Sequence, residues 1–349
     1  MSISIKAIRD YTDEPLRIVT DDPKAPCCDC VVAEDGTLFP AQWDGEKLVV
    51  IASMKAGEEK EFCPETRGIS PAIGVEEKEN SIAVMQNGKF FTEYVFDPAI
   101  PKPYLGPIMA SDGKTSFTRL DLNTTEHVHQ RSVICAVGDV NGVDFWNEFG
   151  NYGFEKHVSI ENMVCGSAFA RFSANNVWQT ADGQPMLDEK RTFTFYNQQG
   201  NIRYVDMEVV FTASYCDVTF GKTKEAGPLG VRVNEELRAD RGGSFTNSYG
   251  GINEDECWGK PAFFCDYKGV IDGTLYGIAV MDNESNERYP TTWHIRNYGL
   301  FAANNLFFKG GLSIPKGETL TYKYRLCFYE GQQINVYDKF NCYINYEKE

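Results

Sequence analysis

The sequence predicts an all-β protein, a large antiparallel β-sandwich. Many short runs of β-branched and aromatic residues are separated by turn residues at regular spacing, which is typical of sandwiches. No segment carries an apolar stripe with a 3.6-residue period over more than about two turns. Hydrophobic residues form 42% and aromatic residues 13% of the 349 residues, enough for a sizeable core.

The N-terminal part is expected to contain short strands joined by polar turns. Residues 48–53 form a compact apolar run, and residues 81–94 form the clearest hairpin. The turn of that hairpin is Asn87-Gly88, a pair that suits a type I′ turn because both central residues need positive φ. We expect residues 1–95 to form strands or a small β module packed on a main sandwich of residues 96–349.

Residues 97–107 are rich in proline. Each proline lacks a backbone N–H, so this segment is expected to be neither a helix nor a central strand. The sequence predicts an extended lead-in to the region that follows.

The second half contains further strands. Residues 191–211 predict a second hairpin, residues 259–282 predict a third around Asp272-Gly273, and residues 293–298 and 319–328 predict the last strands. Short helices are options at 334–343 or 231–237. The chain offers no other helical signal.

Charge and composition exclude several functional classes. The net charge is −16, without a Lys/Arg cluster, which disfavours nucleic acids and anionic membranes as partners. No apolar run reaches the roughly 18 residues of a membrane span, and the N-terminus lacks the apolar core of a signal peptide. The eleven cysteines are scattered and odd in number, so we expect free thiols and a cytoplasmic location.

The most informative motif is the stretch of residues 126–131, which reads Glu-His-Val-His-Gln-Arg. An apolar run follows, so we expect a strand in which His127, His129 and Arg131 project from one face. Two imidazoles on one face can hold a divalent metal ion, or they can act as acid and base near neutral pH. The alternative is a pair of histidines that only satisfy neighbouring polar groups.

A second histidine and arginine pair occurs at residues 293–298. As a strand, this segment would place His294, Arg296 and Tyr298 on one face. Trp146 is a candidate sugar-stacking platform or a core residue. Glu189 is a candidate ligand or base, with a solvated turn as the alternative.

The loop at residues 221–225 resembles a phosphate loop only superficially. It lacks the first glycine at the required spacing and no helix pattern follows, so we expect no nucleotide cofactor. Lys224 in this loop is a candidate substrate contact at a pocket mouth.

An ordered set of motifs resembles the soluble family known as "methane oxygenase PmoA-like". The set covers roughly residues 95–330 and comprises Tyr104-Leu-Gly-Pro, Thr118-Arg119, the stretch 126–131, 138–146, 221–225, 229–233 and 292–301. The chain departs from the family pattern at Val128, Gln130, Asn283 and Asn297, among other positions. The resemblance implies a β-supersandwich of the galactose-mutarotase type, a link to carbohydrate metabolism, and a role for Tyr104 and Arg119 in substrate binding.

The hypothesis that follows is a cytoplasmic enzyme that acts on a sugar or an oxidised (keto) glycoside. His127, His129 and His294 would supply acid/base chemistry or bind a metal, while Arg131 and Arg296 would hold an oxyanion or a hydroxyl. The reaction would be elimination or hydration, as in a lyase, or epimerisation. One alternative is a sugar-binding or structural β-sandwich without turnover, and another is a metal-dependent oxygenase.

Overall fold

The computed structural model describes residues 3–120 and 126–344, and these form three main sheets in which every strand pair is antiparallel. The N-terminal sheet has the order β1-β6-β3-β4-β5-β2. Its strands are β1 (Ile3–Lys6), β2 (Tyr11–Ile18), β3 (Cys30–Ala33), β4 (Leu38–Trp43), β5 (Leu48–Met54) and β6 (Glu59–Glu65).

Two eight-stranded sheets make up the rest, sheet I with the order β21-β22-β17-β11-β10-β9-β8-β7 and sheet II with the order β12-β13-β14-β15-β24-β20-β19-β18. The strands of sheet I are β7 (Ile73–Lys78), β8 (Ser81–Gln86), β9 (Lys89–Val95), β10 (Tyr104–Leu105), β11 (Val133–Val137), β17 (Ala226–Arg232), β21 (Trp293–Ile295) and β22 (Leu300–Ala303). Those of sheet II are β12 (Phe154–Cys165), β13 (Phe169–Gln179), β14 (Pro185–Tyr196), β15 (Ile202–Thr212), β18 (Ser244–Asn247), β19 (Phe264–Ile271), β20 (Thr274–Asp282) and β24 (Thr319–Glu330). The remaining elements are the small β16 (Val218–Phe220) and β23 (Leu312–Ile314) pair, α1 (Asn253–Cys257) and α2 (Val336–Ile344).

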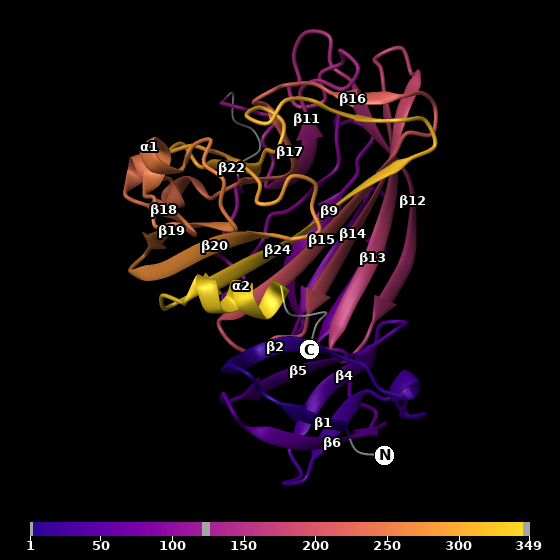
Figure 1. Cartoon of the computed structure of the whole chain (residues 1–349), viewed down its shortest axis with the longest axis vertical. Coiled ribbons are helices and arrows are strands. Elements are labelled where there is room, and N and C mark those ends of the chain that lie inside the picture. The colour runs from indigo at the N-terminus through magenta and orange to yellow at the C-terminus, as the bar shows by residue number, and fades with distance from the viewer. Residues whose placement is uncertain (1–2, 121–125, 345–349) are drawn as a thin grey trace.

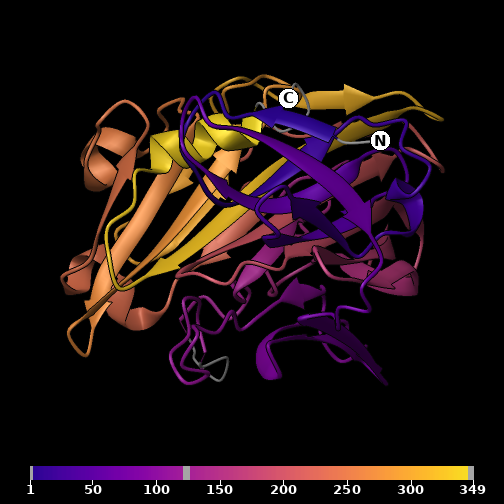
Figure 2. The ribbon, with the colours of Figure 1, turned by 90° about the horizontal axis from the view of Figure 1, so that it is seen from below.

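Sheets I and II lie against each other, as Figures 1 and 2 show, and enclose the main hydrophobic core. Alternate residues of each strand enter this core, such as Phe193 and Phe195 of β14 opposite Val133 and Cys135 of β11. The predicted all-β fold, a large antiparallel sandwich, is confirmed. The other face of sheet II is covered by α2, as Figure 1 shows. Val49 and Ile51 of β5 pack in the same apolar cluster on this face.

Local turn chemistry explains why the hairpins form where the sequence predicted them. Asn87 and Gly88 both have positive φ, 52° and 73°, between β8 and β9. Asp272 and Gly273 do the same between β19 and β20, with φ of 49° and 80°. These are the left-handed conformations that type I′ turns require.

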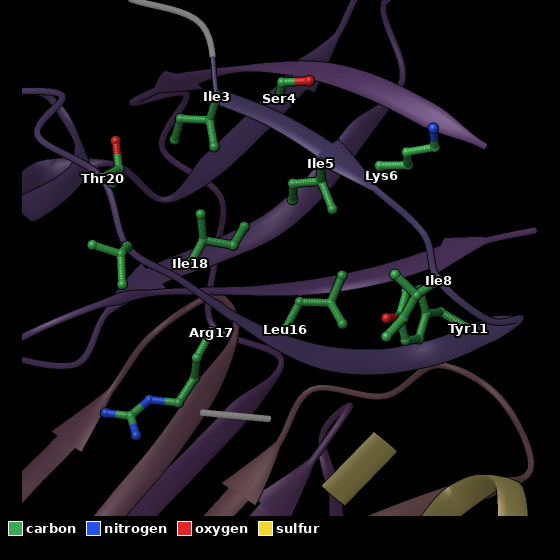
Figure 3. Close-up of a pocket in the computed structure, with 11 residues that line it drawn as sticks. Ile3, Ser4, Ile5, Lys6, Ile8, Tyr11, Leu16, Arg17, Ile18 and Thr20 are labelled. Carbon is green, nitrogen blue, oxygen red and sulfur yellow. The ribbon is translucent and has the colours of Figure 1, made fainter. Parts of the chain in front are cut away.

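The N-terminal sheet ends in two free edges, because β1 and β2 are its outermost strands. Ile3 and Ile5 of β1 face Leu16 and Ile18 of β2 across a cavity of about 630 Å³ (Figure 3). The following strands, β7 to β9, belong to sheet I, and β9 pairs directly with β10. The hydrogen bonds between β9 and β10 thus join strands on either side of residue 95. The division into residues 1–95 and 96–349 stays a prediction.

One prediction about the proline-rich segment is wrong. Tyr104 and Leu105, which form β10, pair with β9 on one side and with β11 on the other, so the segment does supply a central strand. It can do so because the two paired residues lie between Pro103 and Pro107 and keep their own N–H groups.

The option of a short helix near residue 334 is confirmed by α2. Within the ranges 3–120 and 126–344, no helix is long and apolar enough to cross a membrane. All eleven cysteines are free thiols.

Candidate functional site

The stretch that carries His127 and His129 is a turn and not a strand, which corrects the sequence prediction. His127 has a φ of 49°, and the backbone N–H of Gln130 donates to the His127 carbonyl oxygen at 2.9 Å. The strand β11 begins only at Val133. Histidine adopts positive φ more readily than most residues, and the turn still brings the rings of His127 and His129 to a centroid distance of 5.9 Å.

His294 reaches the same place from sheet I. It pairs with Ala302 of β22, Ala302 pairs with Gly230 of β17, and Gly230 pairs with Ile134 of β11. These residues form one row across the sheet, on the face away from the main core. Small residues in the middle of this row leave space above them.

Trp146 fills that space. A Cβ atom on Gly230 would lie 3.6 Å from Trp146 Cη2, and Trp146 packs with Tyr104, Ile134 and Ala302 in a separate apolar cluster. The indole is fully buried. Trp146 therefore serves as the floor of the site as well as a core residue.

The aromatic rings form a continuous chain through the site. The ring of His129 lies 6.3 Å from that of Trp146, and the ring of His294 lies 6.4 Å from the same indole. On the outer side, His127 stacks on Tyr298 at 4.8 Å with an interplanar angle of 7°. The structure thus brings together the two histidine motifs that the sequence singled out.

Several buried polar atoms around the site, Nδ1 of His127 among them, have no hydrogen-bond partner among the described residues. Two of these atoms lie on buried aromatic rings of the site. They are Nε1 of Trp146 and Nδ1 of His294, on side chains that are 0% and 4% exposed. Buried polar groups in native proteins are nearly always hydrogen-bonded, to protein or to ordered molecules. The N–H donor and the ring nitrogen, on two rings whose centroids lie 6.4 Å apart, are therefore candidate contacts for a polar ligand.

Burial keeps the inner histidines neutral. Desolvation, together with the positive charge of Lys102, lowers the pKa of His129 to about 4. Desolvation also lowers the pKa of His294 to about 4, with Arg296 as the second cause, while a hydrogen bond with the Lys224 backbone opposes the shift. Both imidazoles are neutral at pH 7, and Nδ1 of His294 is free to accept a proton.

Two guanidinium groups flank Tyr298. Arg232 lies over the ring at 5.1 Å and Arg296 at 5.5 Å. Arg232 also donates to Gln130 Oε1 at 2.8 Å, which explains one departure from the resembled motif. Arg232 was not among the predicted site residues, because Gln130, its partner at the site, lies about a hundred residues earlier in the chain.

Arg296 is held by an ion pair. Its Nε lies 2.8 Å from Glu254 Oε1. The backbone N–H of Asn297 donates to the other oxygen of Glu254 at 2.9 Å, so this departure from the resembled motif lies beside the same carboxylate.

Arg131 is anchored under the site by Glu148. Its Nη2 lies 2.7 Å from Glu148 Oε2, and its Nη1 also contacts this carboxylate. Lys102 donates from Nζ to Glu148 Oε1 and to the Trp146 carbonyl oxygen, each at 2.9 Å. Burial lowers the pKa of Lys102, with Glu148 opposing. Arg131 thus supports the Trp146 loop instead of pointing an unpaired guanidinium at a ligand.

Arg119 likewise holds the histidine turn. Its Nη1 donates to the carbonyl oxygens of Glu126 and His127 at 3.1 and 3.0 Å, and its Nη2 pairs with Glu235 at 3.2 Å. Glu235 also binds Arg238, at 2.7 Å. Arg119 was predicted to contact the substrate, and in the structure its guanidinium binds the backbone of the histidine turn.

The other predicted residues divide into near and distant ones. Tyr104 packs against Trp146, and Lys224 contributes its backbone to His294 while its side chain extends outward to Glu225. Glu189 lies elsewhere, in the interior, where it accepts hydrogen bonds from Trp178 and Arg191. The idea that Glu189 meets the histidines is wrong, because its side chain points into the sandwich core.

A metal at His127 and His129 would need at least one further ligand. No three His, Cys, Asp or Glu side chains of the described chain lie together in a way that could hold a metal ion. The rings of His127 and His129 are inclined at 72°, and His127 is engaged in its stack with Tyr298. The metal predicted at His127 and His129 therefore stays a prediction, without a third ligand among the described residues.

Solved structures with a similar arrangement come from carbohydrate-related proteins. The chain matches a galactose 1-epimerase from Lactobacillus acidophilus at 10% identity and a TM-score of 0.36, over 75% of this chain and 100% of that one. It matches the α-galactosidase AgaA from Geobacillus stearothermophilus at 13% identity and a TM-score of 0.36, over 74% of this chain and 41% of that one. The match thus spans about two fifths of the α-galactosidase chain. TM-scores at this level carry no argument about function.

No significant match is found among curated proteins. A family model does match, over residues 81–336, which include every element that builds the site. That family is not the methane oxygenase PmoA-like one, so the resemblance inferred from the ordered motifs is wrong as an assignment. The chain belongs to the family of unknown function DUF6807.

Proposed function

We propose that the protein acts on a carbohydrate by histidine-based acid/base chemistry. The observation that carries the proposal is the pair of open, buried nitrogens, Trp146 Nε1 and His294 Nδ1, beside the neutral imidazole of His129. A sugar supplies the hydrogen-bond partners that these nitrogens lack. Its hydroxyl or carbonyl oxygen accepts from the indole, and its C–H or O–H donates to the imidazole.

The favoured reaction is proton abstraction beside the carbonyl of an oxidised sugar. The C–H proton passes to His294 Nδ1, and the bonding electron pair moves onto the carbonyl oxygen as an enolate. The guanidinium groups of Arg232 and Arg296 place positive charge next to the site and stabilise this anion. Expulsion of a neighbouring substituent gives elimination, and return of the proton to the other face gives epimerisation.

One observation favours a second candidate function, sugar binding without turnover. Arg131 and Arg296 are already paired with Glu148 and Glu254, so neither is an unengaged cation for a reaction intermediate. In this case the same side chains recognise a sugar and the neutral histidines act only as hydrogen-bonding groups.

Proton exchange separates the two candidates. The full-length protein is incubated with methyl 3-keto-glucopyranoside in D₂O, and loss of the proton signals next to the carbonyl is followed by NMR. We expect catalysed exchange that falls by about 10²-fold or more in His294→Gln, the usual contribution of a general base. The control is His157→Gln, because His157 stacks on Phe96 and bonds Asn176 elsewhere in the protein.

The results have distinct meanings. Binding of the keto-glycoside without exchange supports the non-catalytic function. Exchange that persists in His294→Gln refutes the assignment of the base, and absence of both binding and exchange refutes the proposal. Oxygen consumption during the incubation would instead support the oxygenase alternative.

A further inference from the structure

A polar groove, separate from the histidine site, lies on the outer face of sheet II, where that sheet meets the N-terminal sheet. Its volume is about 890 Å³, within the range of small-molecule sites. The turn at residues 44–46 between β4 and β5, the loop at 283–285 after β20, and the end of α2 surround it. Figure 1 shows α2 and the N-terminal strands meeting at this side of sheet II.

The strand register makes the floor of this groove polar. Arg171, Thr194, Asp206 and Arg325 pair in turn across β13, β14, β15 and β24. Ser173, Thr192, Glu208 and Lys323 form the next row on the same face. All of these residues except Ser173 and Arg325 line the groove, so hydroxyl, carboxylate and cationic groups form its floor.

Most of the charges in the groove are compensated within the protein. Arg325 donates to both oxygens of Asp206, at 2.7 and 2.8 Å, and Arg17 donates from Nε to Asp44 at 2.8 Å. These pairs fix the orientation of their acceptors and donors without leaving a large net charge. Such a surface suits an uncharged ligand rich in hydroxyl groups better than a phosphate or a basic peptide.

Arg171 is a residue of the groove floor whose guanidinium still has N–H groups to donate. Its Nε donates to Thr194 Oγ1 at 3.0 Å, and its guanidinium lies over the ring of Phe169 at 4.8 Å. It makes no ion pair with any residue in the ranges 3–120 and 126–344. Its outer N–H groups are therefore fixed in direction and available to a ligand.

We propose that this groove binds a neutral saccharide, independently of the histidine site. Arg171 and Thr194 contribute donors and acceptors at one end, and Glu208 and Lys323 at the other. Tyr196, which donates to Asp206 Oδ2 at 2.8 Å, closes the groove with an aromatic ring.

The test uses the full-length protein and two neutral trisaccharides, maltotriose with α-linkages and cellotriose with β-linkages. Isothermal titration calorimetry is expected to detect one of them with a Kd of about 1 mM or below. Arg171→Gln and Thr194→Val, which largely keep side-chain volume, are expected to weaken binding by about tenfold each, as the loss of a ligand hydrogen bond does. Lys190→Gln is the matched control, since Lys190 lies on the same face of β14 but outside the groove.

The outcomes separate this site from the histidine site. Binding that survives in His294→Gln but weakens in Arg171→Gln and Thr194→Val supports the groove. The proposal is overturned if neither trisaccharide binds at about 20 mM. It is equally overturned if binding is lost in His294→Gln while both groove variants retain it. Thermal denaturation of each variant checks that it is folded.

Discussion

The neutral state of His294 predicts how stability depends on pH. Burial lowers its pKa from 6.5 to about 4 in the folded protein. Between these values the unfolded chain binds a proton that the folded protein does not, so stability rises with pH in this window. The contribution is fully present above about pH 6.5 and is lost as the pH falls toward 4. At 1.36 kcal/mol per pKa unit, it amounts to about 3 kcal/mol for His294.

The perturbation is the substitution His294→Gln, which removes the titrating ring. Urea denaturation gives the free energy of unfolding at several values between pH 7 and pH 4.5. The wild-type curve is expected to fall more steeply than the variant curve, by about 1.4 kcal/mol per pH unit. The carboxylates titrate in both proteins, so their contribution to the pH dependence of the free energy of unfolding cancels in the difference between the two curves.

A matched control is available in His127→Gln. The His127 side chain is 38% exposed, so solvent screens its contribution and a much smaller change in slope is expected. Parallel curves for wild type and His294→Gln would show that burial does not keep His294 neutral. That result would also remove the basis for its role as a proton acceptor.

Two further variants test the support of the site. Glu148→Gln leaves the buried Lys102 without its carboxylate and should lower the free energy of unfolding by about 3–5 kcal/mol in a urea titration. Glu161→Gln, in an exposed pair with Lys190, should change the free energy of unfolding far less. Equal effects would contradict the structural role of Glu148. Gly230→Val should displace Trp146 and change the tryptophan fluorescence, because the added side chain would contact the indole. Gly74→Val should leave the fluorescence unchanged, because a Cβ atom at Gly74 would have no atom within 4 Å. An unchanged spectrum in Gly230→Val would contradict the packing described.

Local sequence signals predicted the fold well, because each hairpin depends on residues next to one another. Asn87-Gly88 and Asp272-Gly273 specify their own turns, whatever the rest of the chain does. The turn at His127 shows the limit of such signals. Its alternating side chains imitate a strand, yet the left-handed backbone at His127 follows from hydrogen bonds to Arg119 and Gln130 that the period-two pattern does not encode.

The histidines of the candidate site were selected from the sequence because residue type alone carried the information. Two of the four histidines lie in one motif, and a third has an arginine two residues on, so rarity drew attention to them. Arg232 and Glu148 were missed because arginine and glutamate are common. Their importance comes from partners that are distant in sequence, such as Gln130 for Arg232. A sequence without structure gives no signal for such pairs.

The strongest functional argument comes from a feature that works against stability. An unsatisfied buried donor or acceptor costs about 1–3 kcal/mol, and those of the site include Nε1 of Trp146 and Nδ1 of His294. Gly230 leaves room for the indole, and the Glu148 network fixes the loop that carries it, so several elements maintain this arrangement. An aliphatic side chain in place of His294 would leave no ring nitrogen unsatisfied, although it would lose the hydrogen bond with the Lys224 backbone. The open nitrogens are accounted for if a ligand completes their hydrogen bonds, and this is the reason to look for function on the outer face of sheet I.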